Sequence, residues 1–250
     1  SLALAADRLV NELSSLATWV PLASKEHVKT TFGLQAIPMA WDYAEANPFG
    51  ASTGSIERSF ETVSRALEHL CPLGEGHASV ADAREVDVTG QVIATDPPYY
   101  DNIGYADLSD VFYVWLRTTI QRFYPDLFKT LLTPKSMELI ASPSRHEGSV
   151  SDADSYFEAG FVEVFRRLRS TKPNTPMSFF YAFKQSESDD VEGLGSTGWS
   201  TMLEGLLQAG WKVTATWPMR TERNTGLRAG QNVLASSVLL ACRPRGVDAG

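Results

Sequence analysis

From about residue 77 onward, short apolar segments typical of strands alternate with amphipathic segments typical of helices. This alternation predicts an α/β fold with a mostly parallel sheet and helices on both faces. The expected strands are residues 78–81, 91–95, 177–183, 213–217 and 236–242. The expected helices are residues 108–116, 152–169 and 202–207, and Gly210 is the expected C-cap of the last helix. Ligands of such sheets bind beyond the carboxyl ends of the strands, so candidate site residues are sought there.

The first part of the chain has a different pattern, and we expect a helical and irregular segment over residues 1–75, followed by the α/β part over 76–250. Residues 2–19 are rich in Ala and Leu and predict a helix. A second, amphipathic helix is expected over residues 56–70, behind Ser55 as its N-cap.

Charge and cysteine content exclude several classes of protein. The net charge of −8 argues against a protein that coats nucleic acid by bulk electrostatics, but it permits a local basic surface. No apolar run approaches the roughly 20 residues of a membrane-spanning helix, so no membrane partner is expected. Cys71 and Cys242 match neither a disulfide framework nor a zinc pair, and the four histidines lack metal-ligand spacing, so a cytoplasmic protein without a bound metal is expected.

The strand at residues 91–95 is followed directly by Asp96-Pro97-Pro98-Tyr99. This tetrapeptide arises by chance in about one chain in a thousand of this length, given average residue usage. An exocyclic base amine is a poor nucleophile, and it becomes a better one when both its hydrogens are held by acceptors. The Asp96 carboxylate and the rigid Pro97 carbonyl offer two such acceptors, and the Tyr99 ring offers a face on which an extruded base can stack.

An Asp-Pro-Pro-Tyr sequence after a strand is the signature of the amino-methyltransferases that modify adenine N6 or cytosine N4. The longer string DPPYYDNIGYADLSDVFYVWLR resembles the adenine-specific DNA methylase family that carries a zinc ribbon. The resemblance extends to TTFGLQAIPMAWDYAEANPFG upstream and to LLTPK, FFYAFKQ, TATWPMRTER and ASSVLLACRPR downstream, and so spans most of the chain.

This resemblance implies a Rossmann-like class I methyltransferase fold with an antiparallel last strand, S-adenosylmethionine as cofactor and double-stranded DNA as partner. It implies catalytic roles for Asp96, Pro97, Pro98 and Tyr99 only. The Gly-rich cofactor loop and the zinc ribbon of the family are absent from this sequence. We therefore expect an incomplete fold, with the loop supplied by an upstream part of the same polypeptide or by a companion subunit.

Three further residues are candidates for cofactor binding. Asn47 and Phe49 lie in a Gly- and Ser-containing stretch before the helix at residues 56–70, although such a stretch also serves as a polar capping loop. Asp82 follows the expected strand at residues 78–81, a place suited to contact with the adenine of the cofactor, and a turn or capping role is an equal alternative.

Candidates for substrate contact follow the motif and a later strand. The loop after residue 217 can place arginines on phosphates, because the guanidinium group matches phosphate oxygens. Ordinary solvation is the alternative for all of these loop residues, and Arg166, Arg167 and Arg169 are interpreted as a solvated helix face. The substrate candidates are Tyr100, Asp101, Asn102, Arg220, Arg223 and Arg228.

The sequence therefore favours a DNA adenine-N6 methyltransferase. Cytosine N4 or an RNA base is an alternative substrate for the same chemistry, and Asp as the first motif residue favours adenine in DNA. A methyltransferase-like fragment that binds nucleic acid without catalysis is an alternative of another class, supported by the missing cofactor loop.

Overall fold

The computed structural model describes residues 2–22, 25–33, 37, 39–52, 54–100, 103–171, 175–184, 197–219 and 234–246. The chain divides into two compact units. The first unit comprises Ser1–Val80 and Tyr105–Ser136, and the second comprises Ala81–Gly104 and Met137–Gly250. The segment from Tyr105 to Ser136, which sequence analysis placed with the α/β part, thus belongs to the unit formed by the N-terminal residues.

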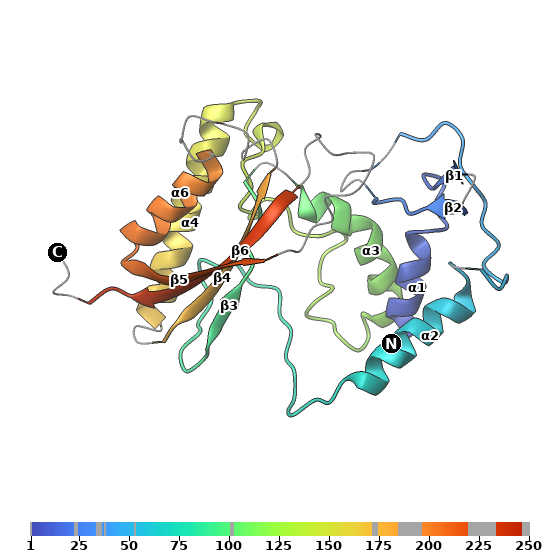
Figure 1. Ribbon diagram of the computed structural model, residues 1–250, viewed down its shortest axis with the longest axis horizontal. Coiled ribbons are helices and arrows are strands. Elements are labelled where there is room, and N and C mark those ends of the chain that lie inside the picture. The colour runs from blue at the N-terminus through green and yellow to red at the C-terminus, as the bar shows by residue number, and fades with distance from the viewer. Residues whose placement is uncertain are drawn as a thin grey trace. The chain divides into compact units, whose positions relative to one another are not determined.

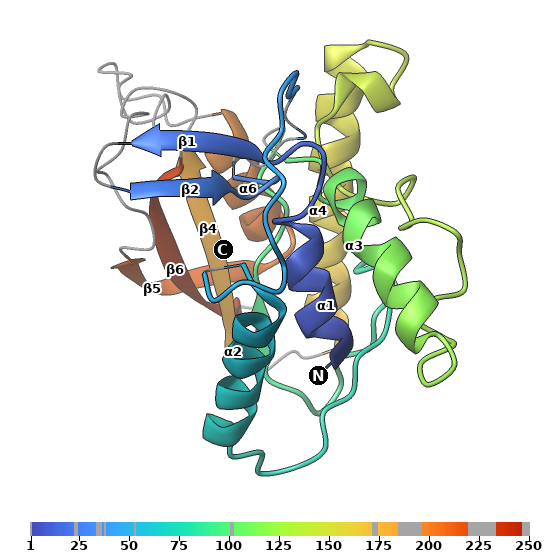
Figure 2. The same ribbon diagram turned by 90° about the vertical axis from the view of Figure 1, so that its right-hand side faces the viewer.

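In the first unit, helix α1 (Leu2–Val10) packs against α2 (Ile56–His69) and α3 (Tyr105–Ile120) (Figure 1). Strands β1 (Thr18–Leu22) and β2 (Lys25–Lys29) form an antiparallel pair, visible in Figure 2. The helices over residues 56–70 and 108–116 are confirmed as α2 and α3, and the Ser55 hydroxyl caps α2 by accepting a hydrogen bond from the Arg58 amide.

The helix predicted over residues 2–19 is wrong beyond Val10, where α1 ends. Local polar side chains favour a turn instead. The Asn11 side-chain oxygen accepts a hydrogen bond from the Phe32 amide, and the Ser14 hydroxyl lies 2.6 Å from that of Thr31. These bonds, and Pro21 within β1, direct this part of the chain into a strand pair rather than a longer helix.

A four-stranded sheet organises the second unit, in the order β3-β4-β6-β5 (Figure 1). Its strands are β3 (Ile93–Thr95), β4 (Met177–Lys184), β5 (Trp211–Met219) and β6 (Leu234–Pro244). The expected antiparallel last strand is confirmed, because β6 runs antiparallel to both of its neighbours. The expected mostly parallel sheet is corrected to a mixed one: β3 and β4 form the parallel pair, and the reversed β6 between β4 and β5 makes the other two pairs antiparallel.

Helices α4 (Val150–Thr171) and α6 (Thr197–Gln208) lie side by side and pack on the same face of this sheet (Figure 1). Within the described residues of the second unit, the expectation of helices on both faces is therefore not met. A short 3-10 helix, η1 (Pro143–Arg145), precedes α4, and Gly210 after α6 has a φ of 84°, as a helix-terminating glycine requires.

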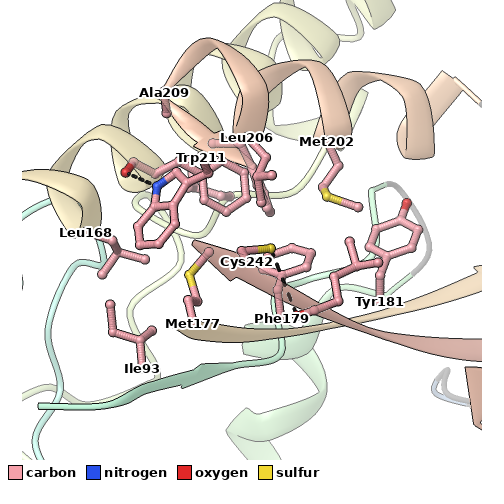
Figure 3. Packing of buried hydrophobic residues seen from close by; sticks show 14 of the residues in the cluster. Ile93, Leu168, Met177, Phe179, Tyr181, Met202, Leu206, Ala209, Trp211 and Cys242 are labelled. Atoms are coloured by element: carbon pink, nitrogen blue, oxygen red, sulfur yellow. Dashed lines mark hydrogen bonds between the residues drawn. The ribbon is translucent and has the colours of Figure 1, made fainter. Parts of the chain in front are cut away.

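The apolar core of the second unit lies between the sheet and these two helices (Figure 3). Met177, Phe179 and Tyr181 alternate along β4 and face the helices. Trp211, at the start of β5, is fully buried and donates its indole N–H to the Phe165 carbonyl oxygen at 2.9 Å. This bond satisfies the one polar group that the indole carries into the core.

Residues 78–81 do not form the predicted strand. They are mostly exposed, and alternating apolar residues form a strand only where a neighbouring strand accepts their backbone hydrogen bonds. The interpretation of Arg167 and Arg169 as solvated is also wrong. Arg167 donates to the Val86 carbonyl at 2.8 Å and Arg169 to the Arg245 carbonyl at 3.2 Å, so both connect α4 to neighbouring segments, whereas Arg166 is exposed.

Candidate functional site at the end of strand β3

The tetrad Asp96-Pro97-Pro98-Tyr99 begins where β3 ends. Because β3 and β4 are parallel, their carboxyl ends share one edge of the sheet, and the tetrad lies at that edge. Asp96 is exposed, whereas the two prolines and Tyr99 are half-buried. The carboxylate is therefore open to solvent rather than packed in the interior, while the turn that carries it is supported by the protein.

The hydroxyl of Tyr99 donates a hydrogen bond to Oδ1 of Asp96 at 2.9 Å. This bond fixes the orientation of the carboxylate and engages one of its two oxygens. The Tyr99 ring meets the ring of Tyr181 from β4 edge to face, with centroids 6.1 Å apart. The tetrad thus couples a carboxylate to an aromatic ring whose orientation is set by a buried neighbour.

Tyr181 also contacts an aromatic side chain of helix α6. The ring of Trp199 lies 5.4 Å from that of Tyr181, centroid to centroid. Gly198 permits this approach, because a Cβ at that position would lie 3.1 Å from both the Tyr181 hydroxyl oxygen and the Tyr100 Cβ. The first turn of α6 therefore packs directly on the residues that border the tetrad.

Tyr100, the residue after the tetrad, is held by contacts with two segments, helix α4 and the residues before η1. It has a φ of 40°, in the left-handed region. Its hydroxyl donates a hydrogen bond to the Asp154 carboxylate, and its ring meets the Phe157 ring edge to face with centroids 5.0 Å apart. Its carbonyl accepts a hydrogen bond from the Ala141 amide at 3.0 Å. These contacts are structural, and the expected contact with substrate stays a prediction.

Asp82 lies in a turn rather than at the end of a strand. Arg84 donates from Nε to Oδ1 at 3.0 Å and from Nη2 to Oδ2 at 2.6 Å, and its amide donates to Oδ1 at 2.9 Å. The side-chain hydrogen bond from Arg84 lowers the pKa of Asp82, and the same bond raises the pKa of Arg84. The carboxylate thus acts as the turn residue that the alternative interpretation described, and contact with a cofactor stays a prediction.

Asn47 and Phe49 belong to the first unit, in the loop that precedes α2. The Asn47 side-chain oxygen accepts a hydrogen bond from the Phe49 amide at 3.0 Å, which closes a local turn. The Phe49 side chain is 85% exposed. These contacts fit the capping-loop alternative, and a role in cofactor binding stays a prediction.

The remaining candidates for substrate contact lie outside the described residues. They are Asp101, Asn102, Arg220, Arg223 and Arg228.

Sequence reasoning did not identify Tyr181, Gly198 or Asp154 as residues of this site. For Tyr181 a signal exists, because it lies in the apolar strand that pairs in parallel with β3, two residues after Phe179, which pairs with Thr95. Asp154 is 54 residues from Tyr100, and no local pattern connects the two.

Comparisons of the chain with protein-family models, curated proteins and solved structures find no match. Across the described part of the chain, no three His, Cys, Asp or Glu side chains are grouped so that they could hold a metal ion. No helix in that part has the length and apolar character to cross a membrane.

Proposed function

We propose that this protein transfers a methyl group from S-adenosylmethionine to an exocyclic base amine, with adenine N6 of DNA as the preferred target. The observation that carries the proposal is the exposed Asp96 carboxylate at the end of β3, held by the Tyr99 hydroxyl and followed by two prolines. Acceptors that are oriented before the base arrives stabilise charge developing on the amine without further rearrangement.

In this mechanism the amine of an extruded base donates one N–H to Asp96 and the other to the Pro97 carbonyl. With Oδ1 engaged by Tyr99, Oδ2 of Asp96 is the oxygen positioned for an external donor. Withdrawing both hydrogens from the ring plane localises the nitrogen lone pair, which makes the amine nucleophilic. Proline has no N–H and a restricted φ, so the diproline keeps the second acceptor rigid.

The Tyr99 ring provides a flat surface for the base. Extruding a base costs a few kcal/mol, which stacking and hydrogen bonds in the site must offset. The edge-to-face contact with the Tyr181 ring holds the Tyr99 ring in place. The half-buried ring beside an exposed carboxylate therefore suits a planar ligand that also carries a hydrogen-bond donor.

The cofactor supplies an activated methyl group, and the roles of Asp82, Asn47 and Phe49 in binding it stay predictions. Both carboxylate oxygens of Asp82 bind Arg84, and the Asn47 side-chain oxygen closes its own turn. The Rossmann-like methyltransferase fold remains part of the proposal, supported by the reversed last strand β6.

The engagement of Asp82 by Arg84 favours a second candidate, a protein that binds nucleic acid through a methyltransferase-like fold without catalysis. Calorimetric titration with S-adenosylmethionine separates the two. Binding supports the enzyme, and absence of binding by the intact protein supports the non-catalytic alternative. Cytosine N4 and RNA bases are distinguished by the modified nucleoside that forms.

The decisive experiment removes the Asp96 carboxylate. In the intact protein, Asp96→Ala should abolish methylation of duplex DNA, because one of the two amine acceptors is lost, while affinity for S-adenosylmethionine stays within about three-fold, or less than 1 kcal/mol. Mass spectrometry of the nucleosides measures methylation and names the methylated atom. Asp126→Ala is the matched control, since that exposed carboxylate forms a surface ion pair with Lys129 and should change nothing. Wild-type activity in Asp96→Ala would refute the mechanism.

A further inference from the structure

The backbone at Tyr100 adopts a conformation that tyrosine rarely takes. Its φ of 40° lies in the left-handed region, where a side chain with a Cβ is crowded by its own backbone. Among the described residues, Glu147 is the other one besides glycine with a positive φ. A strained residue persists only where surrounding contacts hold it, and such residues concentrate at functional sites.

Contacts from separate segments hold Tyr100 in this conformation. Helix α4 contributes the Asp154 carboxylate, which accepts from the hydroxyl, and Phe157, which packs on the ring. The segment before η1 contributes the Ala141 amide, which donates to the Tyr100 carbonyl at 3.0 Å. Gly198 of α6 leaves space beside the Tyr100 Cβ that any larger residue would fill. The residue is thus fixed at its backbone, its Cβ and its hydroxyl.

We propose that Tyr100 is a positioning residue, and that its hydrogen bond to Asp154 holds the turn carrying Asp96 and Tyr99 in the geometry that a base requires. This inference rests on the proposed function. It adds to that function Tyr100 and its partner Asp154 on α4, neither of which touches the base. The Tyr100 hydroxyl is committed to Asp154 and its ring to Phe157, so Tyr100 acts through the turn rather than by stacking on substrate.

The physical reason is the precision that the reaction requires. Displacement of reacting groups by about 1 Å costs on the order of 100-fold in rate. Tyr99 follows the diproline, and Tyr100 is the next peptide unit, so rotation at Tyr100 moves the Tyr99 ring and its bond to Asp96. Loss of the Asp154 contact should therefore lower kcat more than it raises KM for DNA, because the misplaced acceptors fail mainly in the transition state.

The first measurement is hydrogen exchange of the Ala141 amide in the full chain. The amide is protected by its bond to the Tyr100 carbonyl, so it reports on the turn whether or not the protein is an enzyme. Tyr100→Phe and Asp154→Ala should each accelerate exchange at Ala141 by about ten-fold, as expected for a lost hydrogen bond to a charged group. Asp154→Asn keeps an acceptor oxygen for the Tyr100 hydroxyl, so exchange at Ala141 should be slower in this variant than in Asp154→Ala.

The second measurement is the kcat and KM of the intact protein. Tyr100→Phe and Asp154→Ala should each lower kcat on the order of 10-fold or more with KM for DNA within about two-fold, and the double variant should be no worse than either alone. Tyr113→Phe is the matched control, because it removes a tyrosine hydroxyl that donates to the Thr130 carbonyl within the first unit. It should leave kcat unchanged.

The outcomes separate this inference from the proposed function. If the wild-type protein methylates DNA but Tyr100→Phe changes neither kcat nor exchange at Ala141, the positioning role is refuted and the function stands. If kcat is unchanged while KM for DNA rises, Tyr100 contacts substrate and the positioning role is again refuted. If the wild-type protein methylates nothing, the function fails, and exchange at Ala141 alone decides whether the Tyr100–Asp154 pair holds the turn.

Discussion

Tyr99 combines two groups that act differently at the proposed site. Its hydroxyl orients the Asp96 carboxylate through the 2.9 Å hydrogen bond, and its ring is the proposed stacking surface for a base. Aromatic stacking depends on the face of the ring and not on the hydroxyl. Because these contributions are chemically separable, substitution can assign each of them.

We predict that Tyr99→Phe keeps KM for DNA within about two-fold and lowers kcat by about ten-fold, since the ring remains and one hydrogen bond to a carboxylate is lost. Tyr99→Ala should additionally weaken DNA binding, because base stacking on an aromatic ring contributes about 1–3 kcal/mol. Steady-state kinetics measure both effects. Equal losses in the two variants would show that the ring has no separate role.

Asp7 is a residue whose importance the sequence did not reveal. It lies on α1, it is 9% exposed, and its Oδ1 has no hydrogen-bond partner among the described residues. Burial raises the pKa of Asp7 to about 6. In the unfolded chain an aspartate titrates near pH 4, so between about pH 4 and pH 6 the folded state retains a proton that the unfolded state releases. The associated stability is complete below about pH 4 and is lost as pH rises through about 6.

Asp7→Asn should therefore increase the free energy of unfolding by about 2 kcal/mol at pH 7.5 and have little effect near pH 4. The amide stays neutral at all of these pH values, so the cost of ionising a buried carboxyl is removed. Urea unfolding at a series of pH values measures the difference, with Asp126→Asn as the exposed control. Parallel pH profiles for wild type and Asp7→Asn would contradict the prediction.

At the scale of elements, the first turn of α6 approaches the residues around the tetrad because Gly198 has no side chain. Helix propensity alone predicts that Gly198→Ala stabilises α6 by about 1 kcal/mol. The contacts predict the opposite, since the added Cβ would lie 3.1 Å from the Tyr100 Cβ and from the Tyr181 hydroxyl oxygen. Local propensity therefore predicts that Gly198→Ala raises the free energy of unfolding, whereas the tertiary contact predicts that it lowers it.

We expect the contact to dominate, so that Gly198→Ala lowers the free energy of unfolding by about 1–3 kcal/mol. It should also reduce activity, because Tyr100 must shift. Gly74→Ala is the control, as a Cβ there meets nothing within 4 Å. Thermal unfolding and methylation assays measure the two effects. A more stable Gly198→Ala protein would show that α6 moves away at no cost.

The elements themselves were predictable where apolar periodicity is strong. The apolar run of β4 and the apolar stripe of α4 were both recognised in the sequence, and both elements form where they were expected, although β4 was expected to be fully buried and Ser178 and Phe180 are only half-buried. The β1–β2 pair was missed because an Ala- and Leu-rich stretch resembles a helix until the turn after Val10 is known. The strand expected at residues 78–81 does not form because local pattern cannot reveal whether a partner strand is available.

At the scale of the whole molecule, the net charge of −8 limits how DNA can be bound. A protein of this charge repels the phosphate backbone except where cations are concentrated. The loop with Arg220, Arg223 and Arg228 is the candidate from sequence, and it lies outside the described residues. Its contribution can be measured through the dependence of affinity on salt.

If these arginines contact phosphates, replacing all three by Ala should reduce the slope of log affinity against log salt by up to about 3, because each phosphate contact in duplex DNA contributes about 0.9. The loss of affinity should be similar for different DNA sequences, as backbone contacts carry no sequence information. Arg65→Ala, at an exposed ion pair on α2, is the control. An unchanged slope in the triple variant would place the phosphate contacts elsewhere.

The sequence pattern alone determined the mixed α/β character of the chain and the position of Asp96 directly after a strand, because these depend on short-range periodicity and on residues adjacent in the chain. The reversed last strand was expected only from the resemblance to the methylase family. Tertiary structure alone decided that β6 lies between β4 and β5, that Arg84 engages Asp82, and that Asp154 holds Tyr100. These outcomes depend on which side chains meet after folding. Such contacts join residues that are far apart in the sequence, where no local pattern indicates that they will meet. Packing and hydrogen-bond geometry in the folded protein decide which of these contacts form.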